Sequence, residues 1–175
     1  MSMIGLKSAN NSLNEVYSNQ LASTQAIGES QIFLGRARFT MDRVMVHPDA
    51  ADAKDTLARA EQFLESSSKA WKVYLGLPQS VEEKRLSDDM DKKRSDYINN
   101  GVLLMSKALR EGNVEQADSL MMKGLTPLYR SLDQAAETLT QFQVSGAARM
   151  YADSQASYRT QVTMAITGIV VGGLL

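Results

Sequence analysis

Arg94 is the residue of this chain whose position is hardest to explain by packing alone. It stands between Met90 and Tyr97, four and three residues away, which is the spacing of one face of a helix. That face is apolar, so Arg94 is expected to point into the protein interior. A buried charge without a partner is costly. A bound anion would neutralise Arg94 through a two-pronged guanidinium–carboxylate contact.

Hydroxyl groups are expected around Arg94. Tyr97 lies one helical turn away on the same face. Counting about 1.5 Å per residue from the predicted turns brings three further segments to the same height: Gln31, Ser66–Ser68 with Ser67 as the expected contact, and Tyr129–Ser131. The facing stripes carry no acidic residue at this height. These side chains therefore form a candidate site for a small organic acid.

A different interpretation of Arg94 needs no ligand. Its long apolar stem could run past the core to the surface. The guanidinium would then pair with Asp91 or Glu137. Both interpretations remain open at the level of the sequence.

A second basic face lies beside the core stripe of the first predicted helix. Its members follow one another at helical spacing: Arg36, Thr40, Arg43 and His47. This pattern fits a solvated face whose arginines pair with Asp42 or Asp49, and it fits an anion site equally well. Arg38 falls on the core side and could serve either site.

Composition excludes several classes of function. The chain has no cysteine and one histidine, and no carboxylate pair stands at metal-ligand spacing on an inward face, so no catalytic residue, metal site or cofactor is predicted. The formal net charge is -1, which argues against a nucleic-acid surface.

Four helices are predicted from the periodicity of apolar residues. They run from about residue 11 to 46, from an N-cap at Asp49 to about 75, from a capping box at Ser80 to about 111, and from 114 onward. Short breaks between long helices place successive helices antiparallel. The predicted fold is all-α, an antiparallel up-down-up-down four-helix bundle.

The C-terminal segment is expected to begin a membrane helix. Residues 162–175 are fourteen residues without a charge, fewer than the roughly 20 needed to cross a bilayer. We interpret them as the start of a truncated transmembrane helix, and a buried C-terminal helix is the alternative. The prediction is a sensor domain over residues 1–161 whose end helices continue into the membrane.

Three segments resemble one known family. LREGNVEQADSLMMKGLTPLYRSLDQAAETL (residues 109–139), SANNSLNEVYSNQLAST (residues 8–24) and the arginine-rich stretch 36–49 are similar to the periplasmic four-helix-bundle ligand-binding domains of methyl-accepting chemotaxis proteins. The resemblance covers nearly the whole chain. It implies a homodimer in the inner membrane, with this domain in the periplasm.

The resemblance also implies site residues. In that family, arginines near the end of the first helix hold ligand carboxylates across the dimer interface, and a threonine of the last helix assists. The candidates here are Arg36, Arg38 and Arg43, with Thr126 as the threonine. Their spacing, and the proline after Thr126, depart from the pattern of the aspartate receptor.

The predicted function is recognition of a small di- or tricarboxylate such as malate or citrate, followed by a helix displacement across the membrane. Recognition of an aromatic acid or an amino acid is an alternative ligand preference. A membrane-tethered structural bundle is an alternative of another class. Arg94 and Ser67 distinguish these classes, because a purely structural bundle would fill such layers with leucine and alanine.

Overall fold

The computed structural model describes residues 16–172, which form helices and turns without a β-strand. The chain divides into two compact units, one of residues 25–141 and one that joins residues 16–24 to 142–172. The first unit holds the candidate site.

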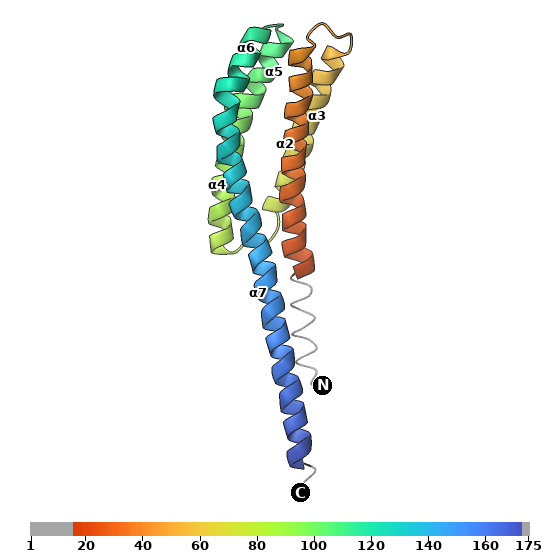
Figure 1. The fold of residues 1–175 in the computed structure, drawn as a ribbon, viewed down its shortest axis with the longest axis vertical. Helices are drawn as coiled ribbons and strands as arrows, with labels where there is room; N and C mark the ends of the chain where they lie inside the picture. The colour runs from red at the N-terminus through yellow and green to blue at the C-terminus, as the bar shows by residue number, and fades with distance from the viewer. Residues whose placement is uncertain (1–15, 173–175) are drawn as a thin grey trace. The chain divides into compact units, whose positions relative to one another are not determined.

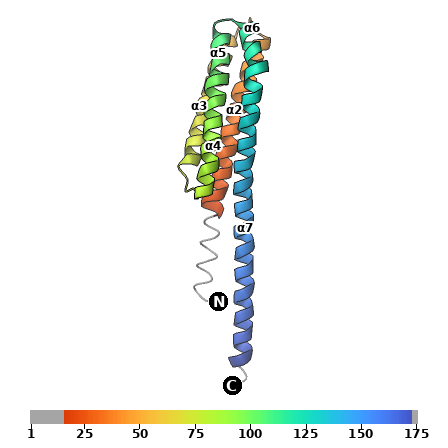
Figure 2. The ribbon, with the colours of Figure 1, turned by 90° about the vertical axis from the view of Figure 1, so that its left-hand side faces the viewer.

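The larger unit is built from four antiparallel helical segments (Figure 1). In chain order the elements are η1 (Val16–Leu21), α2 (Ala22–Val46), α3 (Ala53–Leu75), α4 (Val81–Tyr97), η2 (Ile98–Val102), α5 (Leu103–Arg110), α6 (Val114–Ser119), η3 (Leu120–Leu125) and α7 (Thr126–Gly172). Within residues 25–141, α2 and the α4–α5 segment run in one direction, and α3 and the α6–α7 segment run back (Figure 2). The predicted four-helix bundle is confirmed.

Local sequence signals explain where the helices begin and end. The Ser80 hydroxyl accepts a hydrogen bond from the backbone N–H of Glu83 at 3.2 Å, which is the predicted capping box. Gly112 has a φ of 72°, the left-handed conformation that favours glycine after a helix.

The prediction of Asp49 as the N-cap of the second helix is wrong. Helix α3 begins at Ala53, and the residue before it is Asp52. The Asp52 side chain makes no capping hydrogen bond, because its carboxylate pairs with Arg43 at 2.7 Å instead. A tertiary ion pair therefore takes the place of the expected local cap.

The core of the bundle lies where the apolar stripes meet. The largest fully buried side chains of residues 25–141 are Tyr74, Tyr97, Ile27, Leu34, Met41, Met90, Met105, Leu125, Leu132, Leu139 and Val102. Fully burying an aliphatic side chain of this size contributes about 1.5–3 kcal/mol. These contacts hold the positions of the four helices around the site.

An aromatic–carboxylate cluster joins α3 to α4. The rings of Trp71 and Tyr74 lie 4.9 Å apart. Trp71 Nε1 donates to Asp91 Oδ1 at 2.5 Å, and the Tyr74 hydroxyl donates to Glu83 Oε1 at 3.2 Å. Each buried donor of this cluster therefore meets a carboxylate.

Two π-helical turns interrupt the third and fourth segments. Element η2 packs against η3, and a Cβ atom built on Gly101 would lie 2.8 Å from Leu125 Cδ2. A side chain at this position would have to displace the buried side chain of Leu125. The Thr126 hydroxyl donates to the carbonyl of Met121, and Pro127 follows without interrupting α7.

Residues 162–172 of the apolar C-terminal segment belong to α7. Across residues 16–172, no helix contains an apolar stretch long enough to cross a membrane. The rest of that segment, residues 173–175, lies outside the described residues. The predicted transmembrane start therefore stays a prediction.

Candidate functional site

The candidate site centres on the buried guanidinium of Arg94, on α4. Its side chain is held inside the bundle and the residue is 6% exposed. Nη2 donates to the hydroxyls of Ser67 and Ser68, both at 3.1 Å. Nε is buried and has no hydrogen-bond partner within residues 16–172. One strong donor is therefore left unused in the interior.

The serines around Arg94 direct their own protons elsewhere. Ser67 donates to the carbonyl of Ser30 at 2.8 Å, and the two hydroxyls lie 3.2 Å apart. Ser68 donates to the carbonyl of Leu64 at 3.0 Å. Both serine oxygens are therefore free to accept from the guanidinium, and α2 is tied to α3 at this level.

Arg94 has no ion-pair partner among the described residues. Asp91 accepts from Trp71, and Glu137 is exposed and accepts from Gln141. Burial lowers the pKa of Arg94 from its ordinary value, and the charge of Asp91 opposes this shift. The guanidinium stays protonated at neutral pH, so the interior holds a positive charge whose hydrogen-bond partners, Ser67 and Ser68, are neutral.

Tyr97 and Tyr129 extend the site by one helical turn. Tyr97 is 1% exposed, and its ring lies 5.8 Å from that of Tyr129 on α7. The guanidinium of Arg38 on α2 lies close enough to Tyr97 to influence the pKa of its phenol, and it pairs with Asp42 at 3.4 Å. Burial raises the pKa of Tyr97, and Arg38 opposes the shift.

The structure thus brings together residues from four helices, and the sequence had placed all of them except Arg38 in one candidate site around Arg94. They are Arg38 of α2, Ser67 of α3, Arg94 and Tyr97 of α4, and Tyr129 of α7.

Sequence reasoning missed Ser30. The sequence assigned Gln31 to the inward stripe, whereas the structure places Ser30 there, fully buried between Ile27 and Leu34. The signal was present, because Ser30 lies three and four residues from these two apolar residues. Ser68 belongs to the run of three serines that the sequence placed at the height of Arg94, although only Ser67 was named as a contact.

Two predicted site residues lie away from this cluster. Thr126 is exposed, and its hydroxyl is bonded to the Met121 carbonyl. Arg43 is exposed and paired with Asp52.

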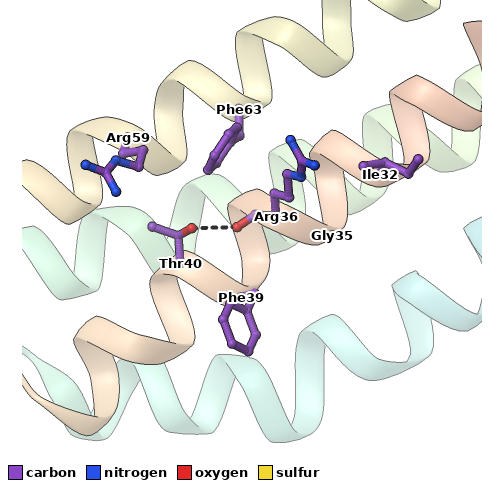
Figure 3. Close-up of a pocket in the computed structure, with 7 residues that line it drawn as sticks. All are labelled: Ile32, Gly35, Arg36, Phe39, Thr40, Arg59 and Phe63. Carbon is purple, nitrogen blue, oxygen red and sulfur yellow. Dashed lines mark hydrogen bonds between the residues drawn. The ribbon is translucent and has the colours of Figure 1, made fainter.

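Arg36 belongs to a separate, open groove between α2 and α3. The groove has a volume of about 550 Å³, and Figure 3 shows its side chains. It is lined by Ile32, Arg36, Phe39, Thr40, Arg59 and Phe63, among others. The Arg36 guanidinium lies 5.6 Å from the ring of Phe33 and 6.0 Å from that of Phe63. Arg36 therefore rests on aromatic faces.

An exposed apolar stripe borders this groove on α2. Ile32, Phe39 and Val46 follow one another at intervals of seven residues and are 55%, 76% and 65% exposed. This spacing puts the three side chains on one side of the helix, as in helices that pair with another helix.

Comparison with known proteins places the chain in a family. Residues 1–147 match the Tar ligand binding domain homologue family. The chain belongs to this family. Its members are periplasmic sensor domains of membrane chemoreceptors and are non-catalytic, so the chain is a ligand-binding sensor domain built as a helical bundle. A comparison with curated proteins gave no significant match.

Proposed function

We propose that this sensor domain binds a small organic acid, a di- or tricarboxylate such as malate or citrate, at the buried guanidinium of Arg94. The proposal rests on the burial of the positively charged Arg94 side chain. Its Nε has no hydrogen-bond partner within residues 16–172. A carboxylate would meet Nε and supply the missing negative charge.

The neighbours of Arg94 suit an acid that carries several polar groups. Ser67 contributes a hydroxyl, and Tyr97 contributes another one turn along α4. Arg38, which reaches Tyr97, offers a second cation for a second carboxylate. The rings of Tyr97 and Tyr129 would wall a flat ligand, which keeps an aromatic acid as the alternative.

A second candidate site lies on the surface of α2. Arg36 in the groove and the exposed stripe Ile32, Phe39 and Val46 support a homodimer interface that holds an anion between two copies. In this arrangement the stripe would be covered by the same stripe of the partner subunit. The Arg94 site needs no second copy.

Signal transmission is proposed to use α7. This helix runs from Thr126 to Gly172, so it joins Tyr129 to the apolar residues from 162 onward without a break in the helix. A small displacement of α7 along its axis would carry ligand binding toward the inner membrane, with residues 162–175 as the start of the membrane helix.

Calorimetric titration of organic acids against the 175-residue chain tests the proposal. Arg94→Met should weaken the best acid at least about 30-fold, which corresponds to roughly 2 kcal/mol or more for a lost buried charge contact. Arg85→Met, at an exposed arginine of the same helix, is the matched control and should leave the affinity unchanged.

Two further variants separate the sites. If Arg36→Met and Arg43→Met weaken binding and Arg94→Met does not, the ligand lies at the α2 surface. If none of the three arginine variants changes the affinity of any acid, the domain is not an anion sensor. A chain that binds no acid at all would overturn the organic-acid proposal.

A further inference from the structure

Gln31 carries another buried polar atom of the bundle that lacks a hydrogen-bond partner within residues 16–172, as do Gln79 and Ser106. Its Oε1 is buried and makes no hydrogen bond within the described part of the chain. A buried acceptor without a donor costs about 1–3 kcal/mol. Gln31 Oε1 can therefore accept a hydrogen bond from a ligand, and Arg94 Nε can donate one.

The position of Gln31 places it beside the Arg94 cluster. It is next to Ser30, whose carbonyl accepts from Ser67, the serine that Arg94 contacts. It also precedes Arg38 by seven residues, two helical turns, so the two side chains leave the same flank of α2. Arg38 reaches Tyr97, so this flank faces the candidate site.

The two unpartnered atoms differ in kind. Arg94 Nε is a donor, and Gln31 Oε1 is an acceptor. A ligand that satisfies both must offer an acceptor, such as a carboxylate oxygen, and a group that carries a proton. A 2-hydroxy acid has these two groups on adjacent carbon atoms.

We propose that Gln31 determines specificity by accepting a hydrogen bond from the hydroxyl of a 2-hydroxy dicarboxylate, so that the site distinguishes hydroxy acids from acids without the hydroxyl. This inference rests on the proposed organic-acid function. It adds a residue and a selection rule to that function.

A hydroxyl fits better than an ammonium group for an electrostatic reason. An ammonium at Gln31 would stand near the positive charges of Arg94 and Arg38. The two carboxylates closest to these arginines in the chain are engaged, Asp42 with Arg38 and Asp91 with Trp71. A neutral hydroxyl supplies the proton without adding a third positive charge.

Three four-carbon acids that differ only at one carbon test the inference. Malate carries a hydroxyl there, succinate a hydrogen and aspartate an ammonium. Calorimetry on the 175-residue chain should find malate about tenfold tighter than succinate, the effect of one well-placed hydrogen bond. Aspartate should bind more weakly than malate.

The Gln31→Met variant keeps the length of the side chain and removes its polar atoms. It should reduce the preference for malate over succinate to less than about twofold, while the affinity for succinate stays within threefold of the unsubstituted chain. Gln25→Met, at an exposed glutamine of the same helix that donates to Glu29, should keep the tenfold preference.

The possible results of these titrations test different parts of the proposal. Equal binding of malate and succinate by the unsubstituted chain overturns the role of Gln31 and leaves the organic-acid function intact. An equal loss of both acids in Gln31→Met overturns it too, because the amide would then serve the carboxylate. Aspartate binding tighter than malate overturns the choice of a hydroxyl. If none of the acids binds, the proposed function fails together with the inference.

Discussion

The bundle contains two polar clusters whose buried groups have different kinds of hydrogen-bond partner. In the aromatic–carboxylate cluster, Trp71 donates to Asp91 and Tyr74 donates to Glu83. In the Arg94 cluster, the charged group meets only serine hydroxyls, and Nε meets nothing in residues 16–172. Both clusters join α3 to α4, so the difference is one of chemistry rather than of location in the fold.

The contrast separates buried donors that meet a carboxylate within the bundle from a buried guanidinium that meets only neutral hydroxyls. When a buried carboxylate accepts a hydrogen bond, that bond offsets part of the free energy needed to remove the carboxylate from water. A guanidinium without an anion carries that cost until an anion binds. Substitutions in the two clusters should therefore move stability and affinity in different ways.

The largest effect is expected at Arg94. Arg94→Met should lower the affinity for the best acid at least about 30-fold, yet raise the free energy of unfolding of the unliganded chain by about 1 kcal/mol or more. The gain is expected because Ser67 and Ser68 keep their carbonyl acceptors when the charge is removed. Urea unfolding without ligand, beside calorimetry, measures both. A clear loss of stability would mean that the cluster is structural.

The opposite pattern is expected at Tyr74. Tyr74→Phe should destabilise the chain by about 1.5–3 kcal/mol, because it removes a hydrogen bond to a buried carboxylate. The affinity for the acid should change less than twofold. Tyr151→Phe, at an exposed tyrosine, is the control and should be nearly neutral. A large loss of affinity in Tyr74→Phe would show that the aromatic–carboxylate cluster also contributes to ligand binding.

Tyr97 should make stability depend on alkaline pH. Burial raises its pKa in the folded chain, so the unfolded chain loses the phenol proton first, above a pH of about 10. The stabilising contribution is complete below that pH and is lost as the pH rises through the folded pKa. Urea unfolding at pH 8 to 11 should show a steeper loss in the unsubstituted chain than in Tyr97→Phe. Equal slopes would contradict burial of the phenol.

The smallest effect is expected at an exposed pair on α4. Lys93 and Asp89 lie 2.7 Å apart with side chains 31% and 49% exposed. Lys93→Ala should cost less than about 1 kcal/mol, because solvent and salt screen such pairs. Thermal unfolding in 0.1 M and about 1 M salt checks this. If Lys93→Ala destabilises the chain as much as Tyr74→Phe does, solvent exposure does not decide how much a polar contact contributes to stability.

Most of the fold could be predicted because the signals are local. Ser80 with Glu83 and Gly112 marked their helix ends correctly, since caps depend on residues a few positions apart. Asp49 is not the cap because turns follow Val46 and delay the start of α3 to Ala53, and Asp52, the residue before α3, pairs with Arg43 instead of capping the helix. Such an ion pair leaves no local pattern.

The candidate site could be predicted in part. Arg94 was expected to point inward because its neighbours at helical spacing are apolar, and it is buried. The partner on α2 was shifted by one residue, from Ser30 to Gln31, because a stripe that advances by three or four residues drifts in phase over a long helix. The contact of Arg38 with Tyr97 needed the packing of two helices far apart in sequence.

The π-helical turns η2 and η3 bear on how related sequences should be aligned. A π turn holds more residues per turn than the α-helix around it, so it amounts to an insertion absorbed inside a helix. A relative without such a turn would need a one-residue gap within 98–102 or 120–125 to keep Tyr97 opposite Tyr129. An alignment that treats these helices as uninterrupted would pair the wrong residues on one side of each turn. Related sequences should therefore be aligned separately on each side of η2 and η3 before ligand preferences are compared across the family.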